Sequence, residues 1–227
     1  MTAKSKKIRL DKFLVENGLT PSRERARALI MAGMVCVDDE MRDKPSVLVW
    51  PQQSIRIKQS SLLRYVSRGG LKLEKALQRF EIDVQGLVCL DVGASTGGFT
   101  DCLLQHGAQR VYALDVGYGQ LAWCLRQDSR VIVIERTNIR RMKADTIPEM
   151  VDLITIDTSF ISLRLVVPAT LPFLTPQGGL VTLIKPQFEV GKEKVGKGGV
   201  VRDPALHQSV IGAIRDFFSA MGLHCQG

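Results

Sequence analysis

The chain has 227 residues, which is long enough for one large domain or for a large and a small one. Its composition, with 45% hydrophobic and 24% charged residues, is typical of a soluble globular protein. All of its excess positive charge lies in the first third: residues 1–80 carry 17 Lys or Arg against 8 Asp or Glu, and residues 81–227 carry 14 against 15. This asymmetry predicts an N-terminal module that binds a polyanion, and the alternative is a solvated basic face without a partner.

The five cysteines are scattered, and none of them forms a C-x-x-C pair. This argues against a disulfide framework and a structural zinc site, and it favours a reducing compartment. The N-terminus lacks the apolar core of a signal peptide, and no apolar run reaches the ~18 residues that a membrane span needs. We therefore expect a cytoplasmic protein that holds no metal and contacts no membrane.

Residues 1–60 are expected to form a small α+β domain. Apolar side chains spaced by three and four residues predict a helix over 8–17, and Ser22 is a good N-cap for a second helix. After Gly33, which suits the end of that helix, short β-rich runs alternate with turn residues. Residues 61–70 are expected to be a linker.

The rest of the chain, residues 71–227, is expected to form a larger domain. It begins with a predicted helix over 71–80, and strands and helices alternate after it. This alternation predicts an α/β fold with a doubly wound parallel sheet, which binds ligands at the carboxyl ends of its strands. The expected elements include a helix over 120–128 and a strand over 178–189. The closing "GLHCQG" resembles the start of a further strand, so the domain is expected to lack its last strands.

A glycine-rich turn, "DVGASTGGF", joins the first strand of this domain to the next helix. Glycines at such a turn let the backbone approach a ligand, and the following helix offers free N–H groups. The spacing is not G-x-G-x-x-G and the turn lacks the lysine of a P-loop, so both pyrophosphate-binding interpretations weaken. A tight strand–helix junction without a ligand is the alternative.

Asp115 ends the second strand, about 20 residues after the turn, where a carboxylate can accept both hydroxyls of a ribose. An adenosine-bearing ligand without a pyrophosphate therefore fits best, and S-adenosylmethionine is the common one. Asn138, after the third strand, is placed to reach the adenine. The expected cofactor-binding residues are Asp91, Gly93, Ala94, Ser95, Thr96, Gly97, Gly98, Phe99, Asp115 and Asn138.

Charged residues of opposite sign end two later strands, Asp157 after "DLITI" and Lys185 after "GLVTLI". A lone charge there is most often a solvated boundary residue, but two beside a ligand turn are harder to dismiss. A ribose hydroxyl is a very weak acid, so its methylation needs a base and a group that stabilises negative charge. Lys72, Asp157 and Lys185 are the right residue types, although the pattern alone makes Lys72 a surface lysine.

Three motifs give residues 65–225 a resemblance to the FtsJ-like ribose methyltransferases of RNA: "DVGASTGGF", "DTSFISL" and "LIKPQFE". The earlier stretch "RLDKFLVENGLTPSRERARALIMAGMVCVD" resembles an S-four-type (alpha-L) RNA-binding domain. With "RYVSRGGLKLEKAL" between them, the two domains are similar to the TlyA family, also called hemolysin A. The resemblance implies a Rossmann-like class I methyltransferase sheet. It also implies transfer of a methyl group from S-adenosylmethionine to a ribose 2'-hydroxyl of ribosomal RNA, at cytidine in characterised members, with ribosomal RNA or ribosomal subunits as the partner.

FtsJ-like enzymes use a Lys-Asp-Lys-Glu tetrad, and the resemblance implies that Lys72, Asp157 and Lys185 are its first three members. The family's glutamate is expected in a strand beyond residue 227, and Glu189 lies in the wrong part of the pattern to replace it. In the N-terminal domain the resemblance implies RNA contacts, which suit phosphates and carry no sequence information. These residues are Arg9, Lys12, Ser22, Arg23 and Arg27.

Three other functions compete with this one. The first is a non-catalytic RNA-binding protein that keeps the cofactor pocket as a relic or a sensor, which the absence of the glutamate favours. The second is a membrane-lytic protein, against which the lack of a span and of a long cationic amphipathic helix speaks. The third is a nicotinamide-dependent oxidoreductase, against which the spacing of the turn speaks.

Overall fold

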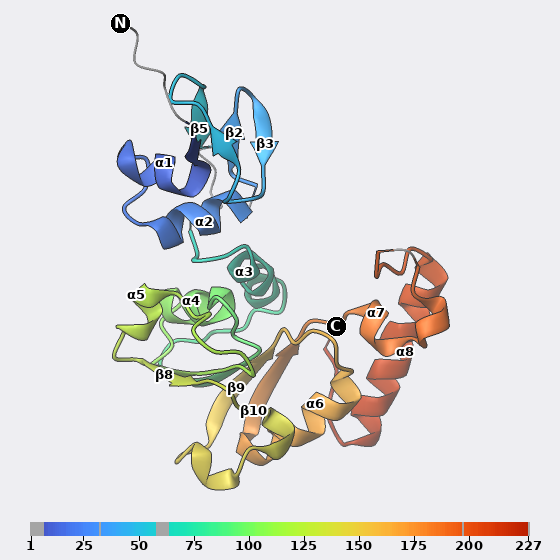
Figure 1. Ribbon diagram of the computed structural model, residues 1–227. Coiled ribbons are helices and arrows are strands. Elements are labelled where there is room, and N and C mark those ends of the chain that lie inside the picture. Colours follow the sequence, from blue (N-terminus) through green and yellow to red (C-terminus); the bar gives the residue numbers. More distant parts are fainter. Residues whose placement is uncertain (1–6, 32, 58–63, 197, 227) are drawn as a thin grey trace, which may run out of the picture. The chain divides into compact units, whose positions relative to one another are not determined.

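The computed structural model describes residues 7–31, 33–57, 64–196 and 198–226 (Figure 1). They form two compact units, which meet in the chain between Arg68 and Gly69. The boundary falls inside the expected linker, of which residues 61–63 lie outside the described residues, as do residues 58–60 of the expected first domain. Within the described ranges, no helix combines the length and the apolar character that crossing a membrane requires.

The described residues of the N-terminal unit form two helices and two small sheets. Its three-stranded sheet is antiparallel in the order β3-β2-β5, and β1 pairs with β4. The predicted helix over 8–17 is shorter than expected, because Ile8 and Arg9 pair with β4 instead. The elements are β1 (Ile8–Arg9), α1 (Leu10–Glu16), α2 (Arg23–Met31), β2 (Val35–Val37), β3 (Glu40–Arg42), β4 (Leu48–Val49) and β5 (Ile55–Ile57).

Local sequence explains the boundaries of this unit. Ser22 Oγ accepts the Arg25 N–H at 3.2 Å, which is the expected N-cap of α2. Asp38 and Asp39 both have positive φ, as the two central residues of a tight β2–β3 hairpin turn require. The core consists of apolar residues from both helices and the strands, namely Leu10, Phe13, Leu14, Ala26, Leu29, Ile30, Met34, Val35, Val37 and Val49.

The C-terminal unit is built on a five-stranded parallel sheet in the order β10-β9-β6-β7-β8, which confirms the predicted doubly wound fold. Helices α4 and α6 cover opposite faces of it (Figure 1). The elements are α3 (Gly69–Arg79), β6 (Val88–Val92), α4 (Gly98–Gln105), β7 (Arg110–Leu114), α5 (Trp123–Arg126), β8 (Val131–Ile134), η2 (Ile139–Arg141), η3 (Ala144–Thr146), β9 (Val151–Ile156), α6 (Leu163–Thr170), η4 (Leu171–Phe173), β10 (Leu174–Thr182), α7 (Pro186–Glu189), η5 (Lys192–Lys194) and α8 (Pro204–Ala220).

Three expectations for this unit are wrong. The helix expected over 120–128 is the single turn of α5. The strand expected over 178–189 ends at Thr182, because Pro186 lacks the N–H that a central strand needs and instead starts α7. After α8, the described residues up to 226 form no further strand.

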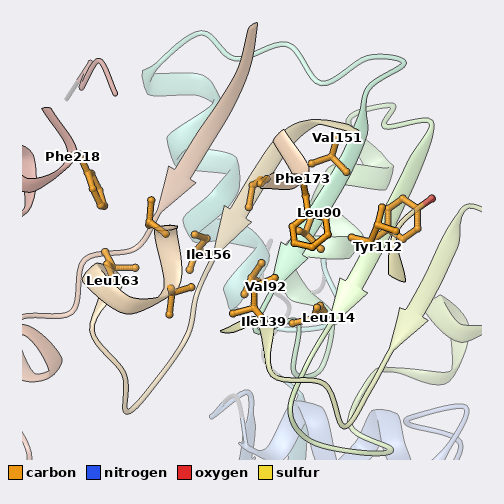
Figure 2. Close-up of a cluster of buried hydrophobic side chains, with 14 of the residues drawn as sticks. Leu90, Val92, Tyr112, Leu114, Ile139, Val151, Ile156, Leu163, Phe173 and Phe218 are labelled. Atoms are coloured by element: carbon orange, nitrogen blue, oxygen red, sulfur yellow. The ribbon is translucent and has the colours of Figure 1, made fainter. Parts of the chain in front are cut away.

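One side of the sheet packs on α6 and α8 through a continuous apolar core (Figure 2). Alternate residues of each strand point into it, for example Leu90 and Val92 of β6. The residue between them, Asp91, therefore faces the other side, where its carboxylate meets Thr100 of α4. This alternation places a buried charge directly beneath the glycine-rich turn.

Candidate active site

The glycine-rich turn leaves the carboxyl end of β6 in a conformation that needs glycine. Gly93 and Gly97 have φ of +86° and +94°, in the left-handed region. A Cβ atom at Gly93 would lie 3.0 Å from the carbonyl oxygen of Asp157, so the turn touches the backbone at the end of β9. The cofactor turn and the predicted catalytic aspartate are thus in direct contact.

Asp115 fixes the exposed part of this turn to the end of β7. Its carboxylate accepts the N–H of Ser95 at 2.8 Å and that of Gly117 at 2.7 Å. The group is only partly buried, and carboxylate oxygens can accept more than one hydrogen bond each. Ser95 and Thr96 are exposed beside it. The Asp115 carboxylate, with the exposed Ser95 and Thr96 beside it, fits a ligand that carries ribose hydroxyls.

Asp91 has a different position from the one expected of a cofactor ligand. It is 1% exposed, and its two oxygens accept the hydroxyls of Thr100 at 2.7 Å and Thr155 at 3.1 Å. Burial raises the pKa of Asp91 to about 6, against the effect of these hydrogen bonds. Asp91 therefore supports the turn from below, and it has no open surface for a ligand.

The other expected cofactor residues also divide into buried ones that support the turn and exposed ones that a ligand can reach. Ala94, Gly97, Gly98 and Phe99 are buried and shape the turn. Asn138 is exposed and close to Asp115 in the fold, because the neighbouring Thr137 N–H donates to the Asp115 carbonyl at 3.1 Å. The Asn138 side chain accepts the Arg140 N–H at 3.0 Å and so starts η2.

Three charged residues from three separate elements meet at the carboxyl end of β9. Lys72 Nζ of α3 donates to Asp157 Oδ2 at 3.2 Å. Lys185 Nζ, after β10, forms an ion pair with Asp157 Oδ1 at 2.6 Å. Lys185 also donates to the Thr158 carbonyl and to Ser159 Oγ, both at 2.9 Å. The structure thus brings the three predicted catalytic residues together.

The two lysines differ in how much freedom they keep. The Lys185 side chain is 17% exposed and its ammonium group has three oxygen neighbours. The Lys72 side chain is 49% exposed, and among the described residues its ammonium group has one oxygen neighbour, Asp157 Oδ2. A hydroxyl that approaches this site therefore meets Lys72 more easily than Lys185.

Of two residues near this cluster, the sequence reasoning did not single out Phe160, and it set Glu189 aside as a member of the tetrad. Phe160 is 91% exposed. Its φ of +64° is unusual for a bulky residue. Its ring centroid lies 5.2 Å from that of Phe188. Glu189 accepts the hydroxyl of Ser162 at 2.6 Å and the N–H of Leu163 at 2.8 Å. An aromatic residue among polar ones three positions after Asp157 was the available signal for Phe160.

In the N-terminal unit, the expected RNA contacts surround a residue that the sequence did not single out. Asp11 has a fully buried carboxylate, which pairs with Arg9 and Arg23 at 3.0 Å each. The guanidinium hydrogen bonds hold the pKa of Asp11 at about 2. Both arginine side chains stay about half exposed, so Asp11 fixes two cations at the surface.

The remaining expected RNA contacts are ordinary surface residues. Lys12 pairs with Glu16 at 3.3 Å along α1, and Ser22 serves as the N-cap of α2. Arg27 is exposed, and no carboxylate of the described residues pairs with it. Arg27 is therefore the member of this group with the most freedom to meet a phosphate.

Two family profiles match the chain. The profile described as "FtsJ-like methyltransferase" matches residues 65–224, and that of the "S4 domain" matches residues 8–53. The first covers most of the chain and contains the glycine-rich turn and the Lys72–Asp157–Lys185 cluster. The second lies within the N-terminal unit.

Similar proteins cover nearly the whole chain. "Putative rRNA methyltransferase YqxC" of Bacillus subtilis is 51% identical over 98% of this chain and 79% of that protein. "16S/23S rRNA (cytidine-2'-O)-methyltransferase TlyA" of Mycobacterium tuberculosis is 47% identical over 98% of this chain and 83% of its own length. A solved structure, "Putative hemolysin from Streptococcus thermophilus", is 43% identical with a TM-score of 0.75, over 99% of this chain and 82% of that one.

Proposed function

Because the chain belongs to the FtsJ-like family of S-adenosylmethionine-dependent methyltransferases, we propose that it methylates a ribose 2'-hydroxyl of ribosomal RNA, at cytidine. The observation that carries this proposal is the Lys72–Asp157–Lys185 cluster beside the Gly93 turn. The names of the M. tuberculosis and B. subtilis relatives support the RNA class. Ribosomal subunits in the cytoplasm would then be the substrate.

The cofactor would be held at the edge of the sheet formed by the ends of β6, β7 and β8. Asp115 would accept its ribose hydroxyls, the Gly93–Gly98 turn would pass against it, and Asn138 would lie near its base. S-adenosylmethionine supplies the methyl group when it is bound. Transfer of this methyl group requires no metal ion.

We propose that the acceptor hydroxyl gives its proton to Lys72 in the neutral amine form of that residue, whose side chain is the more exposed of the two lysines. Asp157 orients Lys72 through the 3.2 Å contact. Lys185 supplies a fixed positive charge beside the carboxylate, and it can stabilise the oxygen anion that forms as the proton leaves. Much of the rate comes from holding the hydroxyl in line with the methyl group.

We propose that the nucleobase of the acceptor nucleotide stacks on the ring of Phe160. Proteins that modify or read single nucleotides of RNA stack the exposed base on aromatic side chains. Phe160 offers an open ring three residues after Asp157, and its backbone strain is of a kind that occurs at functional sites. The N-terminal unit would add phosphate contacts through Arg9, Arg23 and Arg27.

The decisive experiment measures transfer of labelled methyl from S-adenosylmethionine to ribosomal subunits that lack the modification. Wild type, Lys72→Ala and the matched control Lys75→Ala are compared; Lys75 is an exposed lysine one turn along α3. We expect Lys72→Ala to lower the rate by about 10²–10⁴-fold, the usual effect of losing a general acid or base. Lys75→Ala should keep the wild-type rate.

The position of the label tests the site of methylation. A ribose that carries a 2'-O-methyl group resists alkaline cleavage at its 3' phosphate, so the label should be recovered in dinucleotides that begin with cytidine. Label in free mononucleotides would mean base methylation and would contradict the proposal. If wild type binds S-adenosylmethionine but transfers nothing to RNA, the relic-pocket alternative replaces the enzyme.

A further inference from the structure

The loop between Asp157 and α6, residues 158–162, is held by the short segment that follows β10, residues 185–189. Lys185, Phe188 and Glu189 of this segment contact the loop or the residue that follows it. Lys185 Nζ donates to the Thr158 carbonyl and to Ser159 Oγ at one end of the loop, both at 2.9 Å. The Phe188 ring packs against Phe160 in the middle, and Glu189 binds the other end.

Glu189 makes the end contact with both carboxylate oxygens. Oε2 accepts the Ser162 hydroxyl at 2.6 Å, and Oε1 accepts the Leu163 N–H at 2.8 Å. Leu163 is the first residue of α6, so this N–H has no partner within its own helix. Ser162 Oγ in turn accepts the Arg164 N–H at 3.1 Å. One glutamate therefore fixes both the end of the loop and the start of the helix.

We propose that Glu189 is a positioning residue for methyl transfer, which holds the 158–162 loop so that Asp157 and Phe160 keep the geometry of the reaction. This inference rests on the proposed function of the cluster. The loop needs such a restraint, because Phe160 has a φ of +64°, a conformation that persists only where surrounding contacts impose it. Among the described residues, the Glu189 carboxylate bonds Ser162 and Leu163 and pairs with none of the three charged side chains, so its effect passes through the loop.

The test compares Glu189→Gln with Glu193→Gln, a glutamate four positions later that is exposed and has no hydrogen bond to the loop. Glutamine keeps the size of the side chain, but its NH₂ group cannot accept one of the two hydrogen bonds. We expect kcat of Glu189→Gln to fall by about 10- to 100-fold, as misplacement of a reacting group by an ångström does. The Kd for S-adenosylmethionine should stay within about twofold, because Asp115 and the residues of the Gly93–Gly98 turn are not part of the loop.

Hydrogen exchange gives a readout that does not depend on activity. Amides of residues 158–163 should exchange faster in Glu189→Gln than in wild type, and Glu193→Gln should leave them unchanged. An unchanged kcat would overturn the inference. So would a loss of cofactor affinity equal to the loss of kcat, since that would mean general damage to the fold. If wild type methylates no RNA, the proposed function fails, and the exchange rates still report whether Glu189 holds the loop.

Discussion

Gly93 lies so close to Asp157 that a Cβ atom on it would approach the aspartate's carbonyl oxygen to 3.0 Å and its carbonyl carbon to 3.2 Å. Real Cβ atoms rarely come this near to backbone atoms. A side chain at position 93 must therefore displace the end of β9, which carries the aspartate. The cofactor turn and the catalytic cluster cannot shift independently.

We expect Gly93→Ala to lower the rate of methyl transfer by about 100-fold, because the cluster is displaced by a fraction of an ångström or more. Gly86→Ala is the matched control: Gly86 also has a positive φ, of +74°, but nothing lies within 4 Å of its Cβ position. Both variants carry the backbone strain of about 1–2 kcal/mol that alanine suffers there, and Gly93→Ala also carries the clash with the Asp157 backbone, so its thermal stability should fall further. Equal activity of the two variants would contradict a role for the Gly93 contact.

Phe160 should show a trade between stability and activity. Phe160→Gly relieves the positive φ and should raise the free energy of unfolding by about 1 kcal/mol, while it removes the ring that we assign to the acceptor base. We expect its methylation rate to fall by about 10-fold or more, in keeping with the 1–3 kcal/mol of base–aromatic stacking. Phe160→Tyr keeps the ring and serves as the control. A glycine variant that is both stable and fully active would remove Phe160 from the site.

The parts of the site that the sequence predicts are those that follow from the parallel sheet. Asp157 directly follows β9 and Lys185 lies shortly after the neighbouring strand β10, so their meeting follows from the alternation of strands and helices. The hydrogen-bond partners of Asp11 and Glu189 could not be predicted from the sequence, because they depend on how side chains from distant segments pack. Burial of Asp91 could have been anticipated, since it lies inside a run of five strand residues between two apolar ones.

The stability of the N-terminal unit should depend on Asp11 in a pH-dependent way. The pKa of Asp11 is about 2 in the folded unit, below the 3.8 of an ordinary aspartate. Its ion pairs therefore stabilise the fold fully above about pH 4, and this stabilisation is lost as the pH falls toward 2. Asp11→Asn should lower the free energy of unfolding by about 1–2 kcal/mol at pH 6, since both arginines are partly screened by water.

The chain offers a clean reporter for this measurement. Of its two tryptophans, Trp50 lies in the N-terminal unit and Trp123 in the C-terminal one. In a Trp123→Phe background, Trp50 fluorescence follows unfolding of the N-terminal unit alone. The deficit of Asp11→Asn should shrink between pH 6 and pH 3, whereas Asp43→Asn, which changes an exposed aspartate, should show no deficit. A deficit that stays constant with pH would mean that the charge of Asp11 is not what stabilises the unit.

The contribution of Asp91 to the stability of the C-terminal unit should show the opposite pH dependence. Burial raises its pKa to about 6, above the ordinary 3.8, so the folded unit favours the protonated carboxyl. The stability that this preference contributes is present below about pH 4 and is lost as the pH rises through 6. At pH 8 the folded unit must bury an ionised carboxylate, whose cost the hydroxyls of Thr100 and Thr155 offset only in part.

Asp91→Asn replaces this carboxylate with a neutral group of the same shape, which can still bond both hydroxyls. We expect the variant to be as stable as wild type near pH 4.5 and more stable at pH 8, by about 2 kcal/mol as judged from the size of the pKa shift. Thermal or urea unfolding in a Trp50→Phe background follows the C-terminal unit through Trp123, and Asp145→Asn serves as an exposed control. If wild type is the more stable protein at pH 8, the two hydroxyl bonds stabilise the ionised carboxylate by more than its burial costs. The pKa of Asp91 would then not be raised.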